Sequence, residues 1–199
     1  MNVTLNKIRS KPLCTEGWKK LLTSLRKTKA DDEPLSLITI LDSNGLDDAL
    51  WCLRTLEGHD KEIYLYAVWC ARQVQHLMED ERSIKALDVA EAFANGLATK
   101  QEIGAASVAA WAASDAAWTD TWAATAAWAA SDAAWDADAA TAAAARDAAK
   151  DAAARAAAAA ARAAAAAKAA AAWDADAARD AARDAAKDAQ EKEFRRVFK

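Results

Sequence analysis

Residues 109–118 read Ala-Ala-Trp-Ala-Ala-Ser-Asp-Ala-Ala-Trp, and residues 126–135 repeat the same ten residues. The repeat lies in a stretch, from Ala105 to Lys199, that contains neither glycine nor proline. Alanine dominates this stretch, and it is the strongest intrinsic helix former. We therefore expect an all-α protein whose second half consists of long helices, and we expect no sheet-based fold.

The two copies of the repeat are 17 residues apart, which rotates the second by roughly −100° on one straight helix. The tryptophans then form two stripes, one made by Trp111, Trp118 and Trp122 and the other by Trp128 and Trp135. A second repeat, Trp-Asp-Ala-Asp-Ala-Ala, begins at residues 135 and 173 and favours helix starts near Asp136 and Asp174. We expect two or three long helices folded back as an antiparallel bundle; the alternative is one unbroken helix of roughly 140 Å.

The residues before this stretch differ in composition, because all five glycines and both prolines lie at or before Gly104. We expect a helical head domain over residues 1–98 and an Ala/Trp-rich tail domain over residues 99–199. In the head, apolar spacing and turn residues predict helices at about 15–27, 46–56, 60–78 and 82–94. Asp60 is expected to be the N-cap of the third, and Asn95-Gly96 should end the fourth.

Charge and cysteine content indicate the class of protein. The 199 residues carry a formal net charge of −4, which argues against nucleic-acid binding. Three cysteines, an odd number, fit reduced thiols in the cytoplasm better than disulfides. The first residues lack an apolar leader, and Arg155, Arg162 and Lys168 interrupt the alanine tract, so we expect no membrane span.

Opposite charges occupy successive segments of the tail. Residues 101–140 carry six acidic side chains and no lysine or arginine, whereas residues 141–172 carry five basic and two acidic ones, a net of +3. This difference favours antiparallel pairing of the helices. Alanine faces would let the helix backbones approach closely, and indole rings would fill the spaces that the small side chains leave.

Catalytic motifs are not found in the sequence. The two histidines, His59 and His76, do not have the spacing of a zinc site with Cys70, and we expect no metal and no cofactor. Cys52 and His59 could approach each other as nucleophile and base, but no glycine-rich loop or serine elbow accompanies them. We interpret Cys14, Cys52 and Cys70 as small core residues and expect no enzymatic activity.

Tryptophan is the most informative residue type in the tail. Its rings could serve only to hold the tail together, or some could stay exposed next to carboxylates and bind a partner protein. Acidic neighbours would then select a basic partner. The candidate partner-binding residues are Trp111, Asp115, Trp118, Asp120, Trp122, Trp128, Asp132 and Trp135.

Residues 45–54 read Gly-Leu-Asp-Asp-Ala-Leu-Trp-Cys-Leu-Arg, and residues 64–72 read Tyr-Leu-Tyr-Ala-Val-Trp-Cys-Ala-Arg. With Ala86-Leu87-Asp88-Val89-Ala90 and the repeat tail, they resemble a family of small helical immunity proteins of bacterial toxin systems, some of them carried by phages. The similarity covers most of residues 35–199, and in the tail it is largely compositional. It implies neutralisation of a toxin or a bacterial defence protein by binding, without catalytic residues.

We therefore expect an immunity or inhibitor protein that occludes a partner protein. The main alternative is a structural or assembly protein that self-associates through its tail into a homo-oligomer. An enzyme using Cys52 and His59, a DNA mimic based on residues 101–140, and an ice-binding protein are further alternatives. Ice binding would require threonines at a regular 11-residue spacing, which Thr119, Thr121, Thr125 and Thr141 do not keep.

Overall fold

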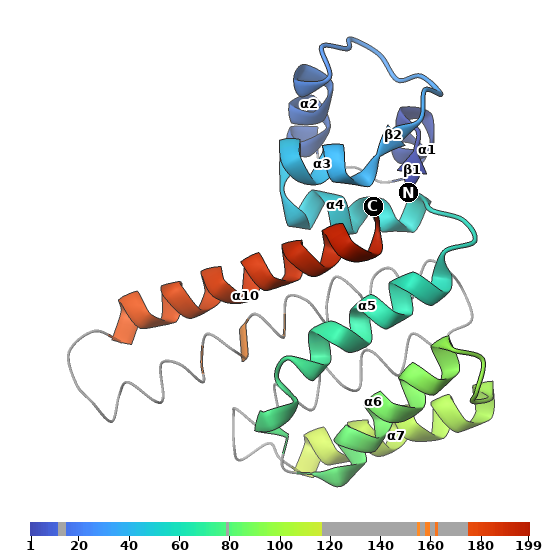
Figure 1. Ribbon diagram of the computed structural model, residues 1–199, viewed down its shortest axis with the longest axis vertical. Coiled ribbons are helices and arrows are strands. Elements are labelled where there is room, and N and C mark those ends of the chain that lie inside the picture. The colour runs from blue at the N-terminus through green and yellow to red at the C-terminus, as the bar shows by residue number, and fades with distance from the viewer. Residues whose placement is uncertain (12–14, 79, 117–154, 156–157, 160–161, 163–174) are drawn as a thin grey trace.

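The computed structural model describes residues 1–11, 15–78, 80–116, 155, 158–159, 162 and 175–199. In this part of the chain it contains eight α-helices, two short 3-10 helices and one two-stranded sheet, which confirms the all-α prediction (Figure 1). The elements are β1 (Asn2–Val3), α1 (Leu5–Arg9), α2 (Thr15–Ser24), β2 (Leu35–Ser36), α3 (Leu37–Asn44), α4 (Leu46–Cys52), η1 (Leu53–Thr55), α5 (Asp60–Arg72), η2 (Gln75–Leu77), α6 (Glu81–Ala94), α7 (Lys100–Ala116) and α10 (Ala175–Val197).

The short sheet joins two segments for which no strand was predicted from the sequence. β1 and β2 pair in antiparallel fashion, with Asn2 opposite Ser36 and Val3 opposite Leu35. Val3 and Leu35 are both buried, so the pairing places the start of the chain over the core formed by α3 and α4.

Short polar side chains define several helix starts. The Thr4 hydroxyl accepts a hydrogen bond from the Lys7 amide at the start of α1, and the Ser36 hydroxyl accepts one from Ile38 at the start of α3. Asp80 accepts from the Arg82 amide at 2.8 Å and caps α6. Each bond satisfies one of the backbone donors that a helix start leaves unpaired.

Two details of the predicted α5 were wrong. Asp60 is the first residue of the helix and not its N-cap, which is His59; a carboxylate in the first turn is still favoured by the helix dipole. The helix also ends at Arg72 and does not continue to Met78. The turn that follows, including η2, still buries Val74 and Met78, so the core gains both apolar side chains without a longer helix.

The tail returns to the head. Ala110 in α7 and Phe194 in α10 belong to the same hydrophobic core as Leu50 and Tyr66. A continuous helix would separate positions 110 and 194 by roughly 125 Å at 1.5 Å per residue, so the alternative of one unbroken helix is excluded. Residues on both sides of the boundary expected at 98/99 share this core. The bundle expected within the tail lies largely outside the described residues.

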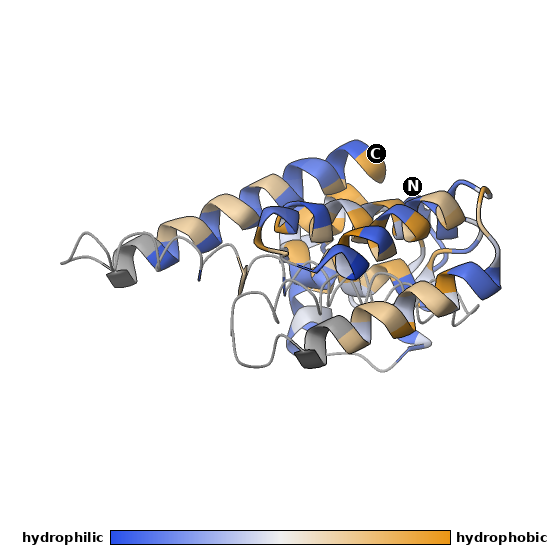
Figure 2. Cartoon of the chain, turned by 90° about the horizontal axis from the view of Figure 1, so that it is seen from below, coloured by the Kyte–Doolittle hydropathy of each residue, from blue (hydrophilic) through white to orange (hydrophobic). Residues whose placement is uncertain are grey.

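The C-terminal end of α10 is held by aromatic packing. The ring centroids of Phe194 and Phe198 are 5.8 Å and 5.6 Å from that of Tyr66, and 4.6 Å from each other. All three side chains are fully buried. In addition, the Tyr66 hydroxyl donates a hydrogen bond to the Gln190 carbonyl at 3.2 Å. α10 therefore forms part of the core, although most of its surface is charged and alanine-rich (Figure 2).

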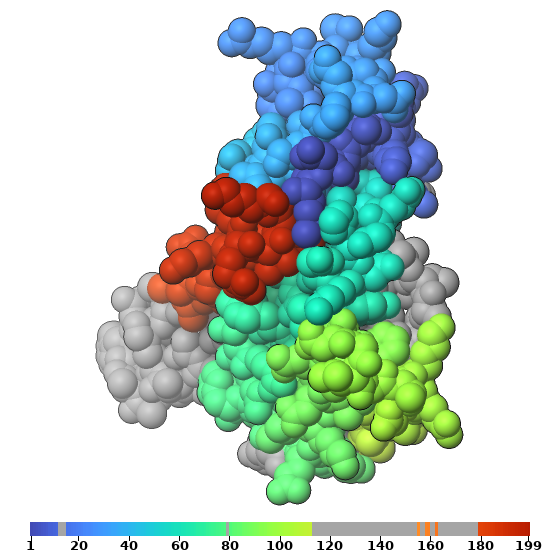
Figure 3. Space-filling view, turned by 45° about the vertical axis from the view of Figure 1, so that its right-hand side comes forward, coloured from blue at the N-terminus to red at the C-terminus, as the bar shows by residue number. Residues whose placement is uncertain are grey.

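Two polar contacts lie around this aromatic cluster. Arg195 pairs with Asp42 of α3 at 2.5 Å, and the Met1 nitrogen donates to the Phe198 carbonyl at 3.1 Å. As a result, the end of α10 is seated beside the N-terminal residues and the α4–α5 region (Figure 3).

Replacement of Phe198 by alanine tests this docking. Because the ring is fully buried, Phe198→Ala should lower the free energy of unfolding by about 3–5 kcal/mol in urea titrations. The control is Lys192→Ala, an exposed position on the same helix, which should change it by less than about 0.5 kcal/mol. Equal stability of the two variants would show that the end of α10 does not contribute to the core.

Candidate functional site

Of the predicted partner-binding residues, Trp111 is the one whose side chain the structure describes. It lies on α7 and is 47% exposed, as the binding interpretation requires. Asp115 belongs to the last turn of α7. The remaining candidates, Trp118, Asp120, Trp122, Trp128, Asp132 and Trp135, lie outside the described residues.

A groove runs along α6 and α7, and Trp111 is not among its lining residues. It has a volume of about 720 Å³. Half of its lining residues are alanines, Val89 and Leu97 add larger apolar side chains, and the other four, Arg82, Lys85, Asp88 and Glu102, are charged; the alanines are Ala86, Ala92, Ala98, Ala105, Ala106 and Ala109. Because methyl side chains fill little space, the two helices leave a concave apolar surface between their outer faces.

The hairpin between α6 and α7 is closed by backbone hydrogen bonds. Gly96 has φ of 72°, its amide donates to the Phe93 carbonyl at 2.9 Å, and the Leu97 amide donates to the Ala92 carbonyl at 2.8 Å. This pair of bonds is the Schellman motif, in which the residue after the glycine usually packs back onto the helix. Leu97 does not: its side chain is 82% exposed.

A capping box begins α7 directly after this turn. The Glu102 carboxylate accepts hydrogen bonds from the Thr99 amide at 2.7 Å and from the Thr99 hydroxyl at 2.8 Å, and the Glu102 amide donates back to that hydroxyl. These bonds from the Thr99 amide and hydroxyl lower the pKa of the Glu102 carboxyl. Glu102 is therefore a fixed negative charge at the edge of the groove.

Three large apolar side chains are exposed around the hairpin. Besides Leu97 and Trp111, Val108 is 64% exposed, three residues before Trp111 and therefore on the same side of α7. Val108 and Trp111 thus lie close together on one side of α7, and grouped exposed apolar side chains mark interaction sites more often than isolated ones do. Sequence reasoning missed Leu97 and Val108, although the Asn-Gly-Leu turn and the Thr-x-x-Glu box could have located the hairpin.

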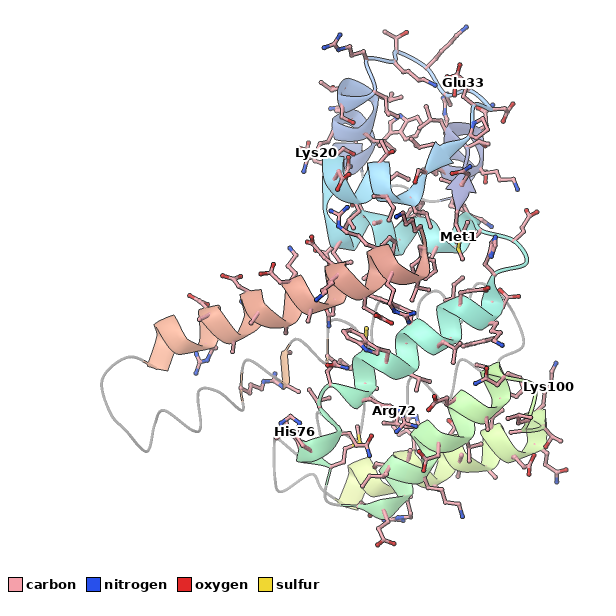
Figure 4. All side chains as sticks on the ribbon, in the orientation of Figure 1. Met1, Lys20, Glu33, Arg72, His76 and Lys100 are labelled. Carbon is pink, nitrogen blue, oxygen red and sulfur yellow. The ribbon has the colours of Figure 1, made fainter. Side chains whose placement is uncertain are left out.

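Ion pairs fix α6 against α5. Arg72 extends from α5 to Asp88 and Glu91 of α6, at 2.9 Å and 2.6 Å, and also donates to Gln75 (Figure 4). Arg82 pairs with Asp80 at the start of α6. Arg72 thus holds α6, one side of the groove, against α5 by charge pairing as well as by apolar packing.

The environment of the cysteines does not favour nucleophilic chemistry. Cys52 and Cys70 are buried free thiols, and burial raises the pKa of each to about 12. His59 lies 3.8 Å from Glu62 and pairs with that carboxylate. Within the described residues, no group of three or more histidine, cysteine or acidic side chains could hold a metal ion. In the same part of the chain, no helix combines the length and the apolar character needed to cross a membrane.

Comparisons with known proteins add no relative: no family model, no curated protein and no solved structure matches the chain. The resemblance to immunity proteins therefore stays a prediction that rests on the sequence segments in which it was seen. The features that bear on function are therefore the α6–α7 groove and the exposed side chains of Leu97, Val108 and Trp111.

Thiol reactivity tests the burial of the cysteines. In a Cys14→Ser background, native protein should not react with Ellman's reagent at about pH 8, since the thiolate is the reactive form and the pKa of Cys52 and Cys70 is about 12. Both thiols should react fully in guanidinium chloride. Rapid labelling of Cys52 in the native protein would contradict this and would restore the Cys52–His59 hypothesis.

Proposed function

We propose that this protein is a non-enzymatic inhibitor that neutralises a partner protein by binding it, as an immunity protein does. The observation that carries the proposal is the exposure of three large apolar side chains, Leu97 at the α6–α7 groove and Val108 and Trp111 elsewhere on α7. The partner would be a toxin or a bacterial defence protein, and its active surface would be occluded by contact with the cytoplasmic inhibitor.

Energetics support a binding role for these side chains. Full burial of a large apolar side chain contributes about 1.5–3 kcal/mol, and exposed tryptophans are frequent hot spots of interfaces. α6 is held by the Asp80 cap and by ion pairs from Arg72, and α7 begins with the Thr99–Glu102 capping box. A preformed surface loses little conformational entropy on binding, so more of the contact energy appears as affinity.

The charge of the tail favours a basic partner. The groove itself is lined by two basic and two acidic side chains, Arg82, Lys85, Asp88 and Glu102, whereas residues 101–140 of the sequence carry six acidic side chains without a lysine or arginine. A partner segment with an apolar face and basic flanks, such as an amphipathic helix, would suit both the groove and this charge. Negative charge would also speed the encounter with such a partner.

Self-association is the second candidate function, because the same exposed side chains could pack against a second copy. An interface between identical copies would be self-complementary about a twofold axis. The acidic charge of residues 101–140 would then face itself, which disfavours this arrangement relative to a basic partner.

The test compares wild type with the double variant Leu97→Glu, Trp111→Ala. A basic protein captured from bacterial lysate should bind the variant about 30-fold more weakly, the loss typical of a hot spot. Toxicity of that protein on expression should be relieved by wild type and not by the variant. Ala185→Glu, on an exposed position of α10, is the matched control and should behave as wild type.

Two outcomes would overturn the proposal. One is equal capture and equal neutralisation by wild type and the double variant. The other is a concentration-dependent oligomer in light scattering that the double variant dissociates while no partner is neutralised, which would instead establish self-assembly.

A further inference from the structure

A second cavity lies among α1, α2, α3 and α4, at the opposite end of the molecule from α6 and α7 (Figure 1). Its volume is about 110 Å³. The floor is apolar and buried, and it consists of Ile8, Leu21, Ile40 and Cys52. Since an apolar cavity of about 150 Å³ holds benzene, this one has room for a group of about four or five carbon atoms.

The mouth of the cavity is aromatic and acidic. The half-buried indoles of Trp18 and Trp51 lie there with the carboxylates of Asp47 and Asp48. In the described part of the chain, neither carboxylate forms an ion pair with a lysine or arginine. Trp51 already contacts a cation, because the Arg54 guanidinium carbon lies 4.8 Å from its ring centre. Indole faces and unpaired carboxylates both attract positive charge.

A hydrogen-bond network fixes one of these carboxylates. The Asn44 amide nitrogen donates to Asp48 Oδ2 at 2.7 Å and to the Gly17 carbonyl at 2.8 Å. The Ser43 hydroxyl donates to Asn44 Oδ1 at 2.9 Å, which sets the orientation of the amide. Asp48 is therefore held in place before any ligand binds.

Gly17 permits this arrangement. A Cβ atom at position 17 would lie 2.6 Å from Asp48 Oδ2, closer than real contacts allow. A glycine inside a helix costs about 1 kcal/mol relative to alanine, and here it lets α2 approach the carboxylate.

The nearest lysine does not fill the site. Lys20 is exposed on α2, and its ammonium donates to the Asn44 main-chain carbonyl at 3.3 Å (Figure 4). It is not among the residues that line the cavity. A ligand cation can therefore reach Asp47 and Asp48 without displacing it.

We propose that this cavity binds a small aliphatic amine, with a branched chain of about four or five carbons on the floor and the ammonium between Asp47 and Asp48. The same chemistry has two sources: a free amine, or a leucine side chain next to a basic residue in a protein chain. The site is separate from the α6–α7 groove and does not depend on the proposed inhibitor function.

The experiment is a titration of the full chain followed by NMR at the indole N–H signals of Trp18 and Trp51. 3-Methylbutylamine is compared with 3-methylbutanol and 3-methylbutanoate, which share its carbon skeleton and differ in charge. The amine should shift both signals and bind about three- to tenfold more tightly than the alcohol, as expected for one partly exposed ion pair.

Two kinds of variant test the contributions of the carboxylates and of the apolar floor separately. Asp47→Asn, Asp48→Asn should remove the preference for the amine, while Asp180→Asn, an exposed carboxylate on α10, should keep it. Cys52→Leu should fill the floor of the cavity and abolish binding. If Cys52→Leu fails to fold, the amine preference of the double asparagine variant still tests the proposal. Leu97→Glu, Trp111→Ala should leave amine binding unchanged, so the two proposals fail independently.

A second comparison shows whether the ligand is a free amine or a segment of a protein chain. If blocked Leu-Arg amide binds more tightly than the free amine and blocked Leu-Glu amide does not, the proposal holds with a protein chain as ligand. If the free amine binds at least as tightly, the proposal holds with a small molecule. Absence of binding by any amine, or equal binding of amine, alcohol and carboxylate, would overturn it.

Discussion

The packing of Phe194 and Phe198 against Tyr66 is the interaction on which the rest of the structure depends. It joins a helix at the end of the chain to the central helix α5. Both rings are fully buried; Phe194 belongs to the last turn of α10 and Phe198 directly follows this helix, which is otherwise charged and rich in alanine. Because α10 has few other large apolar side chains, these two decide where it docks, and its docking completes the core above α5.

The two ends of the molecule carry surfaces of different shape. At one end, small side chains on α6 and α7 leave an open groove with Leu97 exposed at its edge, and Trp111 is exposed elsewhere on α7. At the other, Trp18 and Trp51 stand over a narrower cavity with carboxylates at its mouth. The first geometry fits an extended protein surface, and the second fits a single small group.

Much of the fold could be predicted from the sequence. Local signals, such as Asn95-Gly96 at the end of α6, identified helix boundaries because the turn needs a residue with positive φ. The repeats and the segment charges predicted a fold-back within the tail but not the docking of α10 on the head. The clearest signal for that docking was the pair Phe194 and Phe198, four residues apart. Its partner, Tyr66, is more than a hundred positions away in the chain, so local pattern could not identify the contact.

The candidate site was predicted less completely. Trp111 was expected at an interface because of its acidic neighbourhood, and it is exposed. Leu97 was missed because a residue after a Schellman glycine normally packs onto its helix. The cavity near Asp48 depends on the approach of α2 to α4, which only the packed structure shows; a glycine within a predicted helix was the one hint.

The position of the aromatic cluster also bears on synthesis. The ribosome synthesises α5 before α10. More than 120 further residues, up to Gln190, must be added before the Tyr66 hydroxyl can donate its hydrogen bond to the Gln190 carbonyl. Until the last turn of α10 has left the exit tunnel, the nascent chain presents an incomplete apolar surface of the kind that chaperones recognise. The core of this protein can therefore close only after α10 has been synthesised.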